Sequence, residues 1–177
     1  MQPSGSKSPA MFYSDIQRAF AAGAPIAVHL ALYKADGTVY DKAIRFITGG
    51  DHSHVELALS CDSWGPTPWC LSSSPRDGGV RAKQMPLPLD RWDLLTLPWA
   101  SPRRIVDMFI NIDGQPYDWA GIFLTQFFKF NLINHASFCS EACAYMLDLP
   151  KPTHYSPDHL GALLAIYAPV VMPLETP

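Results

Sequence analysis

The sequence predicts an α+β fold, in which an antiparallel sheet packs against helices. Helical patterns lie near both ends of the chain, and short strand patterns follow one another between them. Consecutive strands followed by helices favour an antiparallel sheet over a parallel one. Of the 177 residues, 48% are hydrophobic and 16% are charged, which suits a sizeable core. The length fits a single domain, expected over residues 11–177 after a flexible tail at 1–10.

The first elements are expected to lead from a helix into the sheet. Ser14 or Asp15 begins a helix that ends before Pro25. A strand over 25–37 and a second helix over 39–50 follow. The next strand, HSHVELALS at 52–60, alternates in polarity, and its two faces differ. One face carries Val55, Leu57 and Leu59, and the other carries His54 and Glu56.

The second half of the chain is expected to complete the sheet and add helices. Further strands are predicted at 68–74, 80–85 and 91–99, with a turn at 75–79 between the first two. Helical segments are predicted at 101–114, 114–130, 136–149 and 156–169. Ser101 caps the first of these helices, and Pro102 takes its first position.

Composition excludes some classes of function. The net charge is −3 without a cluster of Lys and Arg, which argues against a nucleic-acid partner. No apolar run reaches the roughly 20 residues that span a bilayer, so a membrane is not required. The polar start lacks a secretory signal, so we expect cytoplasmic synthesis and no disulfides among the four cysteines. The oligomeric state stays open.

Cys139 is the first candidate for chemistry. With Ser137 as N-cap, Cys139 falls in the first turn of the helix at 136–149. Unpaired N–H groups and the helix dipole favour a thiolate there and can hold an oxyanion, whereas the nearby Glu141 disfavours a thiolate. The alternative is a small buried hydrophobic residue. Cys143, one turn later, is expected to pack in the core.

His54 is the candidate base, because a cysteine nucleophile needs an imidazole to take its proton. Glu56 shares its strand face and is able to orient the ring, or it is a solvated charge. Ser72 or Ser73 is a second candidate for the third group of the site, unless these serines only precede a turn. Tyr117 supplies a hydroxyl to a substrate pocket, or it anchors a turn.

A zinc site is the rival interpretation. Its ligands would be His52, His54, Cys139 and Cys143. Neither pair has zinc-finger spacing, so we expect no metal or other cofactor.

Together these motifs resemble those of the circularly permuted papain-like hydrolases of the NlpC superfamily, in the branch of YiiX-like and lecithin:retinol acyltransferase-like proteins. The shared order is a Thr-Gly-Gly turn, an S-H-V-x-L strand, a Gly-Gly-Val-Arg hairpin, a Y-D segment and F-C-S-E at a helix start. The resemblance covers residues from about 25 to about 160. His54 precedes Cys139, which is the permuted order.

The resemblance implies a Cys139 nucleophile and a His54 base. The family's third polar residue falls at Ser72 or Ser73, where relatives often have an acid, and relatives commonly have glycine where Glu56 stands. Glu56 is able to supply the missing carboxylate.

The implied activity is a cysteine peptidase or amidase, with acyl transfer as a variant. It would cleave an amide or ester in a small molecule, a peptidoglycan peptide or an acyl lipid, through a thioester. A phage particle is one route by which an unexported thiol protease of this kind reaches a cell wall. The alternative is a catalytically inactive papain-like binding module in a larger assembly, such as a phage.

Overall fold

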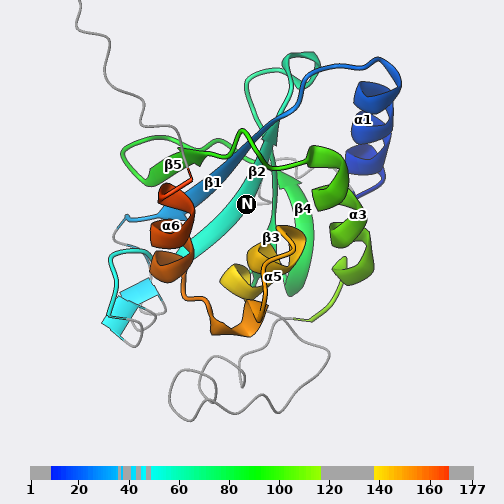
Figure 1. Ribbon diagram of the computed structural model, residues 1–177. Helices are drawn as coiled ribbons and strands as arrows, with labels where there is room; N and C mark the ends of the chain where they lie inside the picture. Colours follow the sequence, from blue (N-terminus) through cyan, green and yellow to red (C-terminus); the bar gives the residue numbers. More distant parts are fainter. Residues whose placement is uncertain are drawn as a thin grey trace, which may run out of the picture.

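The fold is α+β, as the sequence predicts (Figure 1). The structure is a computed structural model that describes residues 9–35, 37, 41–42, 45–46, 49–116 and 138–167. Within these residues, the sheet consists of β1 (Ala27–Tyr33), β2 (His54–Ser60), β3 (Trp69–Ser74), β4 (Gly79–Gln84) and β5 (Trp92–Thr96). The helices are α1 (Pro9–Ala21), α3 (Pro102–Ile112), α5 (Cys139–Met146) and α6 (Pro157–Ala165), with short 3-10 helices η1 (Asp62–Trp64) and η2 (Pro152–His154).

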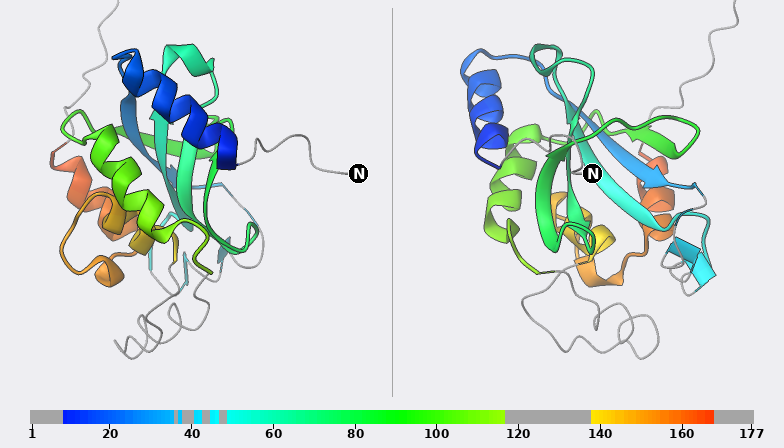
Figure 2. Two further views of the ribbon diagram at one scale, coloured as in Figure 1. Left: turned by 90° about the vertical axis from the view of Figure 1, so that its right-hand side faces the viewer. Right: turned by 180° about the vertical axis from the view of Figure 1, so that it is seen from behind.

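The five strands form one antiparallel sheet in the order β4-β3-β2-β1-β5. Helices α3, α5 and α6 lie in front of this sheet in Figure 1, and the side view of Figure 2 shows them on one side of it. The alternation predicted for β2 is correct, because Val55, Leu57 and Leu59 belong to the main core on this side. Phe12 of α1 joins that core through ring contacts with Trp69 and Phe109.

The opposite face of the sheet is covered by a smaller apolar cluster. Tyr33 and Trp92 pack edge to face, with ring centroids 5.0 Å apart. Met85 and Leu87, from the connection between β4 and β5, pack against the same cluster. The cluster lies beside the face of β2 that carries His54 and Glu56, because Tyr33 pairs with His54 and Ala31 pairs with Glu56.

The sheet forks beside α5. The β2–β3 ladder runs from Leu59↔Trp69 to Leu57↔Leu71 and ends there, although both strands continue. Beyond it, β2 stays paired with β1, and β3 stays paired with β4. The Val55 carbonyl at the fork accepts from the Ser72 hydroxyl at 2.7 Å and from the Cys143 thiol at 3.7 Å. Helix α5 therefore lies over the gap, with its first residue near the start of β2.

Several predicted boundaries need correction. Helix α1 begins at Pro9, not near Ser14, because proline suits the first position of a helix. The strand predicted from residue 52 begins at His54. Half of the helix predicted over 39–50 is described, and its residues 41–42 and 45–46 are helical, whereas the apolar segment at 114–130 lies mostly outside the described residues. The predicted cap of α3 is confirmed, since Ser101 accepts from the Arg104 N–H. None of the helices described is both long and apolar enough to cross a membrane.

Candidate active site

Cys139 is the first residue of α5 and is 4% exposed. Phe138 is the N-cap, with extended backbone, and its N–H donates to the Glu141 carboxylate at 3.4 Å. The predicted cap, Ser137, lies outside the described residues. The first hydrogen bond inside the helix runs from Ala142 N to Phe138 O at 2.9 Å. The backbone N–H groups before Ala142 therefore point out of the helix start, beside the Cys139 side chain.

His54 joins Cys139 from the start of β2. Its ring interacts with the Cys139 thiol through hydrogen bonding and charge, and its Nε2 lies 2.7 Å from Glu56 Oε1. The side chain is 19% exposed and meets the Trp92 ring edge to face at 6.3 Å. Burial by itself would lower the pKa of His54, but the thiol and the carboxylate outweigh burial and raise it to about 10. The surroundings of His54 thus favour the imidazolium form.

Glu56 has no exposed surface, so it is not the solvated charge that was one of two sequence interpretations. The Arg81 guanidinium on β4 contacts both of its oxygens, at 2.6 and 2.7 Å. Burial would raise the pKa of Glu56, but Arg81 and then His54 hold it at about 2. Glu56 therefore remains a carboxylate at neutral pH and accepts the hydrogen bond from His54.

Ser72 and Ser73 on β3 are fully buried. The Ser72 hydroxyl donates to the Val55 carbonyl of β2 at the fork. In the β3–β4 ladder, Ser72 pairs with Arg81. Ser73 pairs with Val80, whose side chain lies in the main core. His54 donates from Nε2 to Glu56 Oε1, so geometry favours Glu56 as the third group. Roles for Ser72 and Ser73 stay predictions, and Tyr117 lies outside the described residues.

Two of the residues considered for zinc, His52 and Cys143, have partners away from the Cys139–His54 pair. Both ring nitrogens of His52 contact carboxylates, at 2.7 Å for Asp158 and 2.9 Å for Asp93. Cys143 is buried over the fork, where burial raises the pKa of its thiol well above the usual value. In the part of the chain that the structure describes, no group of three or more His, Cys, Asp or Glu side chains has a metal-binding arrangement.

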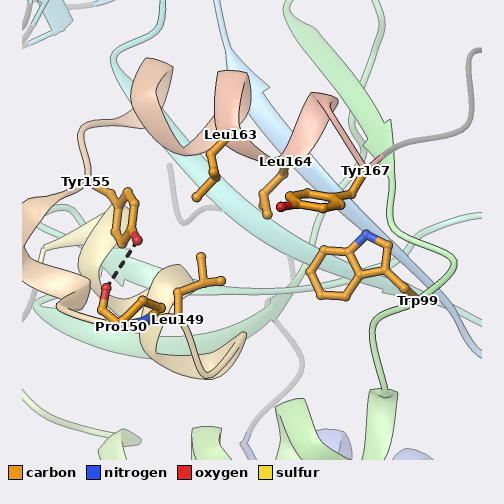
Figure 3. Close-up of a pocket in the computed structure, with 7 residues that line it drawn as sticks. All are labelled: Trp99, Leu149, Pro150, Tyr155, Leu163, Leu164 and Tyr167. Atoms are coloured by element: carbon orange, nitrogen blue, oxygen red, sulfur yellow. Dashed lines mark hydrogen bonds between the residues drawn. The ribbon is translucent and has the colours of Figure 1, made fainter.

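An apolar groove of about 400 Å³ lies away from these residues (Figure 3). It lies between α6 and the segment that follows α5. The groove is therefore near the C-terminal end of α5, whereas Cys139 is at the N-terminal end. The Tyr155 hydroxyl donates to Pro150 O at 3.1 Å on one wall. The lining residues are Trp99, Leu149, Pro150, Tyr155, Leu163, Leu164 and Tyr167.

Arg81 is the site residue that sequence reasoning missed. Its strand was predicted, and the Gly-Gly-Val-Arg hairpin was part of the resemblance, but nothing local connects Arg81 with Glu56. Their contact depends on the strand order, in which β3 separates β4 from β2. Burial of Glu56 would have been the signal, since a buried carboxylate needs a cation or several donors. Glu56 lies beside the smaller apolar cluster, because it pairs with Ala31 in the β1–β2 ladder.

Comparison of the sequence with protein-family models and with curated proteins gives no significant match.

Proposed function

We propose that this chain is a cysteine hydrolase of the permuted papain-like class, acting on an amide or ester through a thioester intermediate. One observation carries the proposal: a thiol at a helix start contacts an imidazole whose other partner is a buried carboxylate. These are the nucleophile, the base and the orienting group of a catalytic triad. The histidine strand precedes the cysteine helix in the chain, and the helix packs across β2 and β3, which fits the permuted fold.

In the proposed chemistry the Cys139 proton passes to His54, whose surroundings favour the imidazolium form. Because Glu56 engages Nε2, Nδ1 is the nitrogen left for the thiol. The resulting thiolate attacks the carbonyl carbon, and the carbonyl electrons move onto oxygen. The N–H groups at the start of α5 hold this oxyanion. The imidazolium then gives its proton to the leaving amine or alcohol as the scissile bond breaks, leaving a thioester on Cys139.

The second half of the reaction releases the acyl group. Water attacks the thioester while His54 takes one of its protons, and the thiol is restored as the acid leaves. An alcohol or amine in place of water would make the enzyme an acyltransferase. Glu56 keeps its negative charge throughout and stabilises the imidazolium in both halves. The proposed substrates are the acyl compounds implied by the resemblance, peptidoglycan peptides and acyl lipids among them.

A non-catalytic binding module with the same fold is the second candidate, favoured by the apolar groove described above. The two candidates differ in the reactivity of Cys139. A hydrolase reacts with acyl electrophiles and with iodoacetamide at neutral pH, whereas a binding module has an unreactive buried thiol.

The experiment is labelling with an activity-based acyl electrophile, with the site mapped by peptide mass spectrometry. We expect the label on Cys139 in the wild type and its loss in Cys139→Ala and His54→Asn. Cys61→Ser is the matched control. Cys61 is another buried thiol, but its hydrogen-bond partner is Ser63 and not a residue of the candidate active site. Equal labelling of the wild type and His54→Asn would contradict the proposal. A screen of peptidoglycan fragments and acyl lipids then identifies the substrate.

A further inference from the structure

Glu56 is held from two sides at once. Its Oε1 lies 2.6 Å from Arg81 Nη2 and 2.7 Å from His54 Nε2, and its Oε2 lies 2.7 Å from Arg81 Nη1. One oxygen is therefore shared between the guanidinium and the imidazole. A two-pronged contact fixes the plane of a carboxylate, which a single hydrogen bond does not. The plane set by Arg81 determines where Oε1 meets the His54 ring.

We propose that Arg81 is a positioning residue of the Cys139–His54 site, which keeps Glu56 ionised and aimed at the His54 ring. This inference rests on the proposed function for its catalytic meaning, although the coupling of the three side chains is measurable without any substrate. Arg81 does not touch the thiol or the reacting carbonyl. It acts through Glu56, from a strand two places away in the sheet.

Arg81 is itself fixed in place. Its Nε donates to Asp77 Oδ2 at 2.8 Å, and its side chain is only 14% exposed. Asp77 lies in the turn before β4 and also accepts from Lys83 at 3.2 Å. The guanidinium thus uses one edge for Asp77 and its fork for Glu56. This anchoring leaves Arg81 little freedom to follow Glu56 if the carboxylate turns.

The charged and titratable groups around Glu56 come from its own strand and from three neighbouring elements. They are His54 on β2, Arg81 on β4, Cys70 on β3 and Cys143 on α5. Both thiols are buried, and the charge of Glu56 adds to the rise in their pKa caused by burial. Neither thiol offers a positive charge. Without Arg81, His54 would be the one cation left among these groups. Glu56 and His54 would then titrate as a coupled pair in a site that disfavours isolated charge.

The test is an NMR titration of protein carrying ¹⁵N-labelled histidine, which follows the His54 ring nitrogens with pH. In the wild type we expect no inflection from Glu56 above about pH 3, because the pKa of Glu56 is about 2. In Arg81→Met, Glu56 takes up a proton at or above its ordinary pKa of about 4.3. The Nε2 signal then shows an acid inflection at least one unit higher than in the wild type.

Two variants separate charge from geometry. Arg81→Lys keeps the charge but not the two-pronged contact with Glu56. We expect its acid inflection to stay at the low pH of the wild type, and iodoacetamide to modify Cys139 more slowly than in the wild type at pH 7. Lys83→Met is the matched control, because Lys83 contacts Asp77 from the same strand but does not touch Glu56. We expect neither the inflection nor the modification rate to change in this control.

An Arg81→Met protein that folds and titrates as the wild type does would overturn the inference. If this variant does not fold, Glu56→Gln/Arg81→Met replaces the ion pair by neutral groups, a change that buried pairs often tolerate. In the double variant the pKa of His54 must fall, since its carboxylate partner is gone; an unchanged His54 titration would also overturn the inference. The proposed function fails separately, if Cys139 of the wild type is unreactive while the titrations behave as expected.

Discussion

His52 and His54 are two residues apart and both contact carboxylates, yet their surroundings differ in kind. Both ring nitrogens of His52 contact acids, Asp158 on α6 and Asp93 on β5. His54 has one acid, Glu56, and one thiol, Cys139. A ring held between two carboxylates is stabilised as a cation with no free position for a proton. A ring between a carboxylate and a thiol has one nitrogen with which to exchange a proton.

The backbone around His52 strengthens this contrast. The N–H groups of Asp51 and His52 both donate to the Asp158 carboxylate at 3.2 Å. Asp158 is in the first turn of α6, so this contact ties the helix to the chain just before β2 begins. His52 is therefore a structural clamp that holds the start of the strand on which His54 lies. His52 thus fixes the strand, and His54 lies on the strand that this contact holds.

The largest expected effect separates the two histidines by activity. Once a substrate is found, His54→Asn should lower kcat/KM by roughly 10²–10⁴-fold, the usual contribution of a general acid and base. His52→Asn should keep kcat/KM within a few-fold, because an amide still hydrogen-bonds to Asp158. Steady-state kinetics at pH 7 measure both values. If both variants fold and lose kcat/KM equally, the two histidines do not differ in function.

The second expected effect concerns the acids. Glu56→Gln leaves the partly buried Arg81 with only one of its two carboxylates, and breaking a pair with a buried carboxylate costs about 3–5 kcal/mol of the free energy of unfolding. Asp158→Asn affects a partly exposed contact and should cost about 1 kcal/mol. Urea denaturation compares the two variants at one pH. The reverse order would show that the clamp contributes more to stability than the buried pair.

The third expected effect is a pH dependence of the clamp. Burial lowers the pKa of His52, but hydrogen bonds and charge from Asp93 and Asp158 outweigh burial and raise it above 6.5. Since the folded state binds the proton more tightly, the stabilisation is fully present below about pH 6.5 and is lost as pH rises through the raised pKa. The stability difference between the wild type and His52→Asn should therefore shrink from pH 6 to pH 9. A growing difference would contradict the contacts at His52.

The sequence predicted the parts of the site that depend on local patterns. Alternation in β2 placed His54 and Glu56 on one face, and the helix start placed Cys139 in a first turn, although the cap is Phe138. The ion pair between Glu56 and Arg81 depends on strand order and register, which join residues 25 positions apart. Such a contact leaves no periodic trace in either strand.

Burial of the His54 face was equally hidden. Beside that face, Met85 and Leu87 of a proline-rich connection between strands pack against Tyr33 and Trp92. Turn composition predicts that a connection lies at the surface, not which face of a sheet it covers. The same reason explains why Glu56 was open to interpretation as a solvated charge. The fold class, in contrast, follows from the order of elements, and that order is local information.

The smallest expected effect concerns an exposed ion pair beside His52. Lys34 contacts Asp93 at 2.7 Å, beside His52, and both members of this ion pair are substantially exposed. An exposed pair contributes about 0–1 kcal/mol, so Lys34→Met should change the free energy of unfolding by less than that. Removing a neighbouring cation should also raise the pKa of His52 slightly and leave the His54 signals unchanged in a ¹⁵N titration. A shift at His54 would show that the two histidines are electrostatically coupled through β1.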